Sequence, residues 1–183
     1  MGKFEDKRVI VTGAGIGIGF ATVKAFAEAG ATVALIDIAG ALAGESATSI
    51  NTEIGAERVF PYGLDVADVS AVRSMVDDFT AQQGSLDILI ANAGITNYGS
   101  FLDYTPEAFD RLTGVNLRGS YFSAQAAARN MIASGTPGRI ILMSSVTGVQ
   151  AMLNLSAYGM TKAAIRHIAK TISGKLGEHK ITV

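Results

Sequence analysis

A tyrosine and a lysine four residues apart, Tyr158 and Lys162, have types and spacing that suggest proton-transfer chemistry. Residues at positions i and i+4 share one face of a helix. A neighbouring ammonium favours the phenolate form of tyrosine, which makes the side chain a usable acid or base near neutral pH. The pair is also typical of a packed tyrosine beside a solvated lysine. Ser144 and Ser145 favour the chemical interpretation because they follow an apolar run, and open α/β sheets bind ligands at strand ends.

The glycine-rich segment TGAGIGIG at 12–19 lies between the first predicted strand and the first predicted helix. Glycines there permit a tight turn and let a pyrophosphate approach the backbone and the helix N-terminus. An ordinary structural turn is the alternative interpretation. The segment nevertheless favours nucleotide binding, and its candidate cofactor residues are Gly13, Gly15, Ile16, Gly17, Ile18 and Gly19.

Asp37 ends the second predicted strand, 18 residues after Gly19. This is close to the spacing at which a carboxylate meets the ribose hydroxyls of a bound adenosine. A carboxylate would repel a 2′-phosphate, and neither Ile16 nor Ile38 supplies a compensating cation. The sequence therefore predicts NAD rather than NADP, with a helix-capping or turn aspartate as the alternative.

Two further loops follow predicted strands and contain candidate cofactor contacts. Asp65 and Val66 follow the third strand, where Asp65 is a candidate contact to the adenine or, equally, a cap of the next helix. Asn92, Ala93 and Gly94 follow the fourth strand. Small residues let that loop lie against a cofactor, although Asn-x-Gly is also ordinary turn chemistry.

Short apolar runs alternate with longer helical patterns along the chain. Strands are predicted at 8–12, 32–36, 58–62, 86–90 and 139–143, and helices near 17–29, 41–54, 69–83, 106–134 and 157–177. This alternation predicts an α/β fold, a doubly wound parallel sheet of the Rossmann type with helices on both faces. We expect one dinucleotide-binding and catalytic domain over residues 1–183. Residues 180–183 look like the opening of a sixth strand, so the last strands are expected to be incomplete.

Composition excludes several classes of function. The 183 residues carry 15 Lys and Arg against 16 Asp and Glu, a formal net charge of −1 that argues against binding nucleic acid or anionic lipid. With no Cys and two His, no metal site is predicted. Residues 140–161 carry no formal charge but are too polar to cross a membrane. The charged N-terminus does not resemble a signal peptide, so the cytoplasm is the expected location.

Together these motifs closely resemble the short-chain dehydrogenase/reductase family over nearly the whole chain. The resemblance rests on TGAGIGIG, Asp37, ANAG at 91–94, Asn116 in GVNLRGSYF, RIILMSSVTG at 139–148 and YGMTK at 158–162. It implies an oxidoreductase that transfers a hydride between NAD and a secondary alcohol or ketone.

The resemblance also implies roles for four catalytic residues. Tyr158 would be the general acid/base, and Lys162 would favour its phenolate and hydrogen-bond the nicotinamide ribose. Ser145 would hold and polarise the substrate oxygen, which leaves Ser144 as a strand-end residue. Asn116 would hold a water that links Lys162 to solvent.

Two departures from the family pattern are visible. Ala91 stands where the family usually has asparagine, a mild change. Family members also continue past the strand begun at Ile181, so we expect this chain to lack the usual C-terminal substrate-covering segment. The family further implies a homodimer or homotetramer. A non-catalytic nucleotide-binding module and a related epimerase or dehydratase are the alternative functions.

Overall fold

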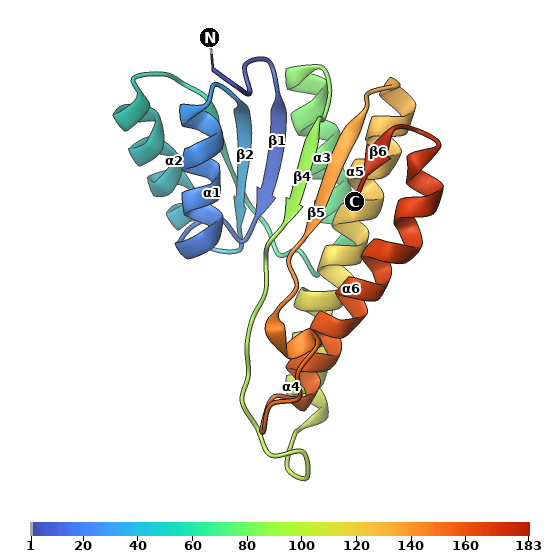
Figure 1. The fold of residues 1–183 in the computed structure, drawn as a ribbon. Coiled ribbons are helices and arrows are strands. Elements are labelled where there is room, and N and C mark those ends of the chain that lie inside the picture. Colours follow the sequence, from blue (N-terminus) through green and yellow to red (C-terminus); the bar gives the residue numbers. More distant parts are fainter. Residues whose placement is uncertain (1) are drawn as a thin grey trace.

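A six-stranded, wholly parallel sheet forms the centre of the molecule (Figure 1). The computed structural model describes residues 2–183. The strands are β1 (Arg8–Thr12), β2 (Thr32–Asp37), β3 (Val59–Gly63), β4 (Ile88–Ala91), β5 (Gly138–Leu142) and β6 (Ile181–Thr182), in the spatial order β3-β2-β1-β4-β5-β6. The predicted fold class is confirmed.

Helices cover both faces of the sheet and enclose two apolar cores. Helices α1 (Gly17–Glu28) and α2 (Gly40–Ile54) pack on one face, while α3 (Val69–Gln83), α5 (Ser120–Ser134) and α6 (Ser156–Gly177) pack on the other. Alternate strand residues point to opposite faces. Val9 and Val11 therefore enter the core beneath α1 and α2, and Ile10 enters the core beneath α3 and α5.

The strand order reverses at β1, whose two neighbours are β2 and β4. Ligands of open α/β sheets bind at such a switch point, beyond the carboxyl ends of the strands. The pairing of Val11 with Ile90 brings the ends of β1 and β4 to the same edge. The loops that follow these two strands must therefore lie side by side.

The helix predicted over 106–134 is present over the whole of that range, but it is not α-helical throughout. Its α-helical parts, α4 (Pro106–Thr113) and α5, are joined without a gap by a π-helical turn, η1 (Gly114–Gly119). Glycine is a weak helix former, and a glycine stands at each end of η1. Inside the turn, the Asn116 side chain hydrogen-bonds the backbone of Ile95 in another loop. Such π-helical turns are frequent at functional sites.

The sixth strand is short, but it is already part of the sheet. Gly138 pairs with Ile181 and Arg139 pairs with Thr182, both in parallel register. Ile181 is fully buried. On the neighbouring β5, Ile140 is buried while Ile141 is 39% exposed, so this side of the sheet is covered less completely than its centre. Among residues 2–183, no helix combines the length and apolar character needed to span a membrane.

Candidate active site

A cavity of ≈ 340 Å³ lies beyond the carboxyl ends of the strands at the switch point. Its wall is formed by the glycine segment, the loops after β2, β3 and β4, and one residue each from α4 and η1. Eight of the predicted cofactor residues line it: Gly13, Ile16, Asp37, Asp65, Val66, Asn92, Ala93 and Gly94.

The glycine loop and the loop after β4 are held together by hydrogen bonds between them. The Thr12 hydroxyl accepts hydrogen bonds from the backbone N–H groups of Asn92 (3.1 Å) and Ala93 (3.0 Å). In return, Asn92 Nδ2 donates to the carbonyl oxygens of Thr12 (3.0 Å) and Gly13 (2.8 Å). The Asn92 side chain therefore joins the two loops rather than facing a ligand with its amide.

Gly13 occupies the closest point between these loops. Its φ of 60° is a left-handed conformation that glycine adopts without steric cost. A Cβ at this position would stand 2.6 Å from Ala93 Cα, inside van der Waals contact. Only glycine fits both the turn and the neighbouring loop.

Asp37 bonds the glycine loop directly. Its Oδ2 accepts from the Gly15 N–H at 3.0 Å, and its Oδ1 accepts from the Ala39 N–H at 3.1 Å. The side chain is half-buried and lines the cavity. A carboxylate oxygen can accept more than one hydrogen bond, so both oxygens keep acceptor capacity toward the cavity.

On α6, Lys162 is a buried lysine with one hydrogen-bond acceptor in the described chain. It is 4% exposed, and its Nζ donates to the Met143 carbonyl at 2.8 Å. Its Nζ lies 5.7 Å from the centre of the Tyr158 ring. Burial lowers the pKa of the Lys162 ammonium. Ser144 Oγ also donates to the Lys162 carbonyl at 2.8 Å, so the loop after β5 is bonded to this residue twice.

Asn116 connects η1 to two other segments. It is fully buried, its Oδ1 accepts from the Ile95 N–H at 2.8 Å, and its Nδ2 donates to the Ile95 carbonyl at 2.9 Å. The same Nδ2 lies 3.3 Å from Thr161 Oγ1 on α6. A Cβ on Gly94 would stand 3.4 Å from Asn116 Oδ1 and 3.5 Å from Lys162 Nζ. The amide and the ammonium therefore flank the same small residue at the cavity wall.

Comparisons with known proteins agree with this fold. The family model for short chain dehydrogenase matches residues 7–183. The chain belongs to the short-chain dehydrogenase family. This family comprises oxidoreductases that use NAD(P) and act on small molecules.

Individual relatives differ in how much longer they are than this chain. Probable oxidoreductase EphD of Mycobacterium tuberculosis is 40% identical over 163 residues, which are 89% of this chain and 27% of that protein. Short-chain dehydrogenase reductase 5 of Arabidopsis thaliana is 35% identical over 182 residues, covering 99% of this chain and 69% of the relative. A crystal structure of NAD+-bound xylitol dehydrogenase is 34% identical with a TM-score of 0.93, covering 99% of this chain and 69% of that one.

Several predicted cofactor residues lie outside the cavity wall. Gly15, Gly17, Ile18 and Gly19 shape the loop and the first turn of α1 instead. Gly15 is bonded to Asp37, and Gly17 has a φ of 61°. Ile18 is 67% exposed. Their roles as direct cofactor contacts stay predictions.

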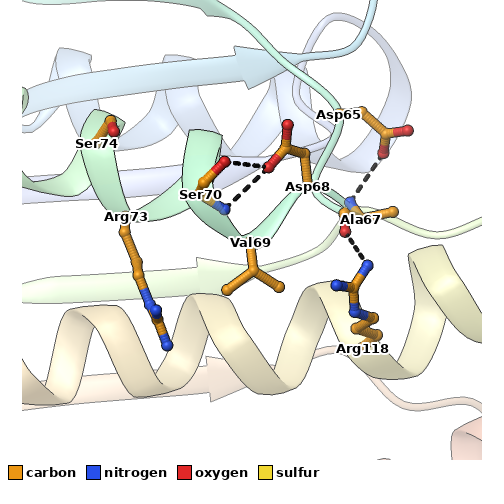
Figure 2. Close-up of a pocket in the computed structure, with 8 residues that line it drawn as sticks. All are labelled: Asp65, Ala67, Asp68, Val69, Ser70, Arg73, Ser74 and Arg118. Atoms are coloured by element: carbon orange, nitrogen blue, oxygen red, sulfur yellow. Dashed lines mark hydrogen bonds between the residues drawn. The ribbon is translucent and has the colours of Figure 1, made fainter.

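Asp65 is not the cap of α3, which removes one of its two predicted roles. Asp68 occupies the cap and accepts from the Ser70 N–H at 2.9 Å (Figure 2). It also accepts from the Ala71 N–H at 3.1 Å. Asp65 Oδ1 instead accepts from the Ala67 N–H at 2.9 Å. Asp65 and the buried Val66 also line the cavity, so contact with the adenine remains the predicted role of Asp65, and Val66 remains a predicted cofactor contact.

Four functional positions were missed from the sequence. Thr12 joins the two loops, Thr161 bonds Asn116, Thr147 bonds Ser145, and Arg111 lines the cavity. The first three are threonines, which lie at the end of β1, in α6 and in the turn after β5, and no local pattern specifies a partner for them. Arg111 lines the cavity one helical turn before Val115, which lines it too, but the sequence alone marked neither residue. Among residues 2–183, no three His, Asp or Glu side chains gather closely enough to bind a metal ion.

Proposed function

We propose that this chain is an NAD-dependent oxidoreductase that interconverts a secondary alcohol and a ketone, with Tyr158 as the general acid/base. The observation that carries the proposal is the buried ammonium of Lys162 beside the Tyr158 ring, at the end of β5 and next to the cavity. Burying an ammonium with one hydrogen-bond acceptor is unfavourable for folding, so a chemical role explains the residue better than packing does.

The cavity fits the adenosine half of a dinucleotide. Its wall combines apolar side chains from Ile16, Leu64 and Val115 with the carboxylate of Asp37. The N-terminus of α1 follows directly, where backbone N–H groups favour a pyrophosphate. Because a 2′-phosphate would face the Asp37 carboxylate, the site supports NAD over NADP.

When bound, NAD supplies hydride transfer, and the chain supplies orientation and proton transfer. In oxidation, the Tyr158 phenolate takes the alcohol proton, and in reduction the phenol returns it to the ketone oxygen. Lys162 favours the phenolate through its charge and keeps two further N–H donors beyond the one given to Met143. The Ser145 hydroxyl donates to the substrate oxygen and polarises it. Asn116 would connect the ammonium to solvent through its place beside Gly94.

A small-molecule polyol is the substrate class to test first, because one similar structure is a xylitol dehydrogenase.

We also propose that the chain forms a homo-oligomer. Helices α5 and α6 border an apolar groove of ≈ 420 Å³, whose wall includes Ala124, Ala128, Ile132, Ile168 and Ile172. An apolar groove on two long helices is suited to pairing with a second copy.

Calorimetric titration of the chain with NAD and, separately, NADP tests the cofactor assignment. We expect saturable binding of NAD and at least tenfold weaker binding of NADP. NADH formation is then followed with xylitol, cyclohexanol and 2-butanol. Binding of NAD without turnover of any probe would support a nucleotide-binding module instead, and binding of neither cofactor would overturn the proposal.

A further inference from the structure

The Ser145 hydroxyl has both of its acceptor positions occupied by one residue. Ser145 Oγ accepts a hydrogen bond from the Thr147 N–H at 3.3 Å and a second from Thr147 Oγ1 at 3.0 Å. A serine hydroxyl has two acceptor lone pairs and one O–H donor. Once Thr147 engages both lone pairs, the hydrogen-bonding capacity left to Ser145 is its own O–H.

Thr147 is fixed relative to helix α6, which contains Tyr158 and Lys162, by a close backbone contact. It lies in the 3₁₀ turn η2 (Val146–Gly148), which packs against the start of α6. A Cβ on Gly159 would stand 2.9 Å from the Thr147 carbonyl oxygen, so a larger residue there would push η2 away. Gly159 directly follows Tyr158. The close contact therefore sets Thr147 and Ser145 in a defined position relative to Tyr158.

We propose that Thr147 is a positioning residue that makes Ser145 a one-directional hydrogen-bond donor to the substrate oxygen. The inference rests on the proposed function. A ketone oxygen would accept the Ser145 O–H directly. An alcohol oxygen would accept it as well, which leaves the alcohol's own proton to point at Tyr158. Oxidation removes one proton, taken by Tyr158 Oη, and one hydride, taken by NAD+, so Ser145 neither gains nor loses a proton.

Without the Thr147 hydroxyl, Ser145 would regain a free lone pair. The substrate alcohol could then donate to Ser145 instead of Tyr158, and part of the bound population would be oriented unproductively. Thr147→Val removes the hydroxyl at nearly constant shape, while Thr147→Ser retains it. Loss of one neutral hydrogen bond predicts a kcat roughly three- to tenfold lower for Thr147→Val. Thr147→Ser should stay within about twofold of the parent, since its O–H can still occupy the lone pair.

A double-mutant cycle tests whether Thr147 acts through Ser145. The rate of NADH formation is measured for the parent, Thr147→Val, Ser145→Ala and the double variant, with the best of xylitol, cyclohexanol and 2-butanol as the probe. We expect Thr147→Val to have no further effect on kcat once Ser145 is alanine. Calorimetric affinity for NAD and the midpoint of thermal unfolding should be the same in the parent and Thr147→Val.

Thr52→Val is the matched control, because Thr52 is exposed on α2 and its hydroxyl donates to the Thr48 carbonyl of the same helix. It should leave kcat unchanged. An equal loss from Thr147→Val with and without Ser145, or no rescue by Thr147→Ser, would overturn the inference while the proposed function stands. A parent that turns over no probe would overturn the proposed function and the inference together.

Discussion

At the glycine-loop end of the candidate active site, Thr12 and Asn92 each make two hydrogen bonds to backbone groups of the neighbouring loop. Asp37 accepts one from Gly15 in the glycine loop and one from Ala39. At the other end, Lys162 is buried with one backbone acceptor, and its charge faces no carboxylate within the described residues. The first group of polar side chains completes the fold of the loops. The Lys162 ammonium, by contrast, lies where burial disfavours its charge.

This difference indicates that the two ends of the site contribute differently to folding stability and to the proposed reaction. Side chains at the glycine-loop end satisfy backbone donors and acceptors, so removing them should weaken folding as well as cofactor binding. At the α6 end, the functional atoms of Tyr158 and Lys162 contribute less to the fold than to the proposed reaction. Substitutions there should lower turnover without a matching loss of stability, as in other stability–activity trade-offs.

Tyr158→Phe should produce the largest change in turnover. It removes the proton-transferring hydroxyl while keeping the ring, so kcat should fall roughly 10²- to 10⁴-fold. NAD affinity, measured by calorimetry, should change less than about twofold because the hydroxyl is not part of the cavity wall. Tyr121→Phe on α5 is the control and should retain full activity. A parallel loss of NAD affinity would contradict the role given to Tyr158.

Lys162→Met should lower kcat by roughly 10²-fold, since the phenolate of Tyr158 loses its neighbouring cation. Its effect on stability should depend on pH. Burial lowers the pKa of Lys162 from its ordinary value of 10.5, so the unfolded chain binds this proton more tightly than the folded chain does. The parent's free energy of unfolding should therefore rise relative to that of the variant as the pH increases toward 10.5.

Urea unfolding of the parent and Lys162→Met at several pH values between neutrality and 10.5 measures this difference. Lys170→Met is the matched control, because Lys170 is an exposed lysine on the same helix. The control should show a constant difference from the parent over the range. A constant difference for Lys162→Met as well would show that burial does not disfavour its charge.

Gly13→Ala should have the opposite effect to the substitutions at Tyr158 and Lys162, because it should lower the stability of the fold at the glycine loop. A left-handed alanine and the contact with Ala93 together predict a loss of about 2–4 kcal/mol of unfolding free energy. Gly44→Ala in α2 is the matched control, since a Cβ there meets no atom within 4 Å. That control should be neutral or stabilising by up to about 1 kcal/mol. Equal stabilities for the two variants would mean that the glycine loop can move away from the loop after β4 with little loss of free energy.

The sequence predicts the scaffold well because strand burial and glycine placement are local signals. The apolar runs at β1, β4 and β5 and the position of the glycine segment were sufficient to predict a parallel sheet with a nucleotide site after its first strand, whereas the strand order comes from the structure. The π-helical turn η1 within the predicted helix was not predicted, because the Asn116 side chain in this turn bonds Ile95, a residue 21 positions away. Helical periodicity over 106–134 contains no information about such a contact.

The same limit applies within the site. Asp37 was predicted from its distance along the chain to the glycine segment, and it does line the cavity. Its hydrogen bond to Gly15, by contrast, depends on how two loops approach each other. Thr12 and Thr147 were missed for this reason, since a threonine hydroxyl gains a specific role only when the folded chain brings a partner within hydrogen-bond distance.

Asp37→Asn should have the smallest effect of these substitutions. It tests the glycine-loop end of the site by removing the charge of Asp37 while keeping a hydrogen-bond acceptor there. Asparagine keeps one oxygen acceptor for the Gly15 N–H, so stability should fall by no more than about 1 kcal/mol. Loss of the negative charge should relieve repulsion of a 2′-phosphate and narrow the preference for NAD over NADP by about tenfold. Calorimetric Kd values for both cofactors measure the ratio, and Asp77→Asn on α3 should leave it unchanged.

If Asp37→Ala narrows the ratio equally but is clearly less stable, the carboxylate has two separable roles: its charge selects the cofactor, and its oxygens hold the glycine loop. An unchanged ratio in both variants would assign Asp37 to the loop alone, and NAD selection would have to come from elsewhere in the cavity wall.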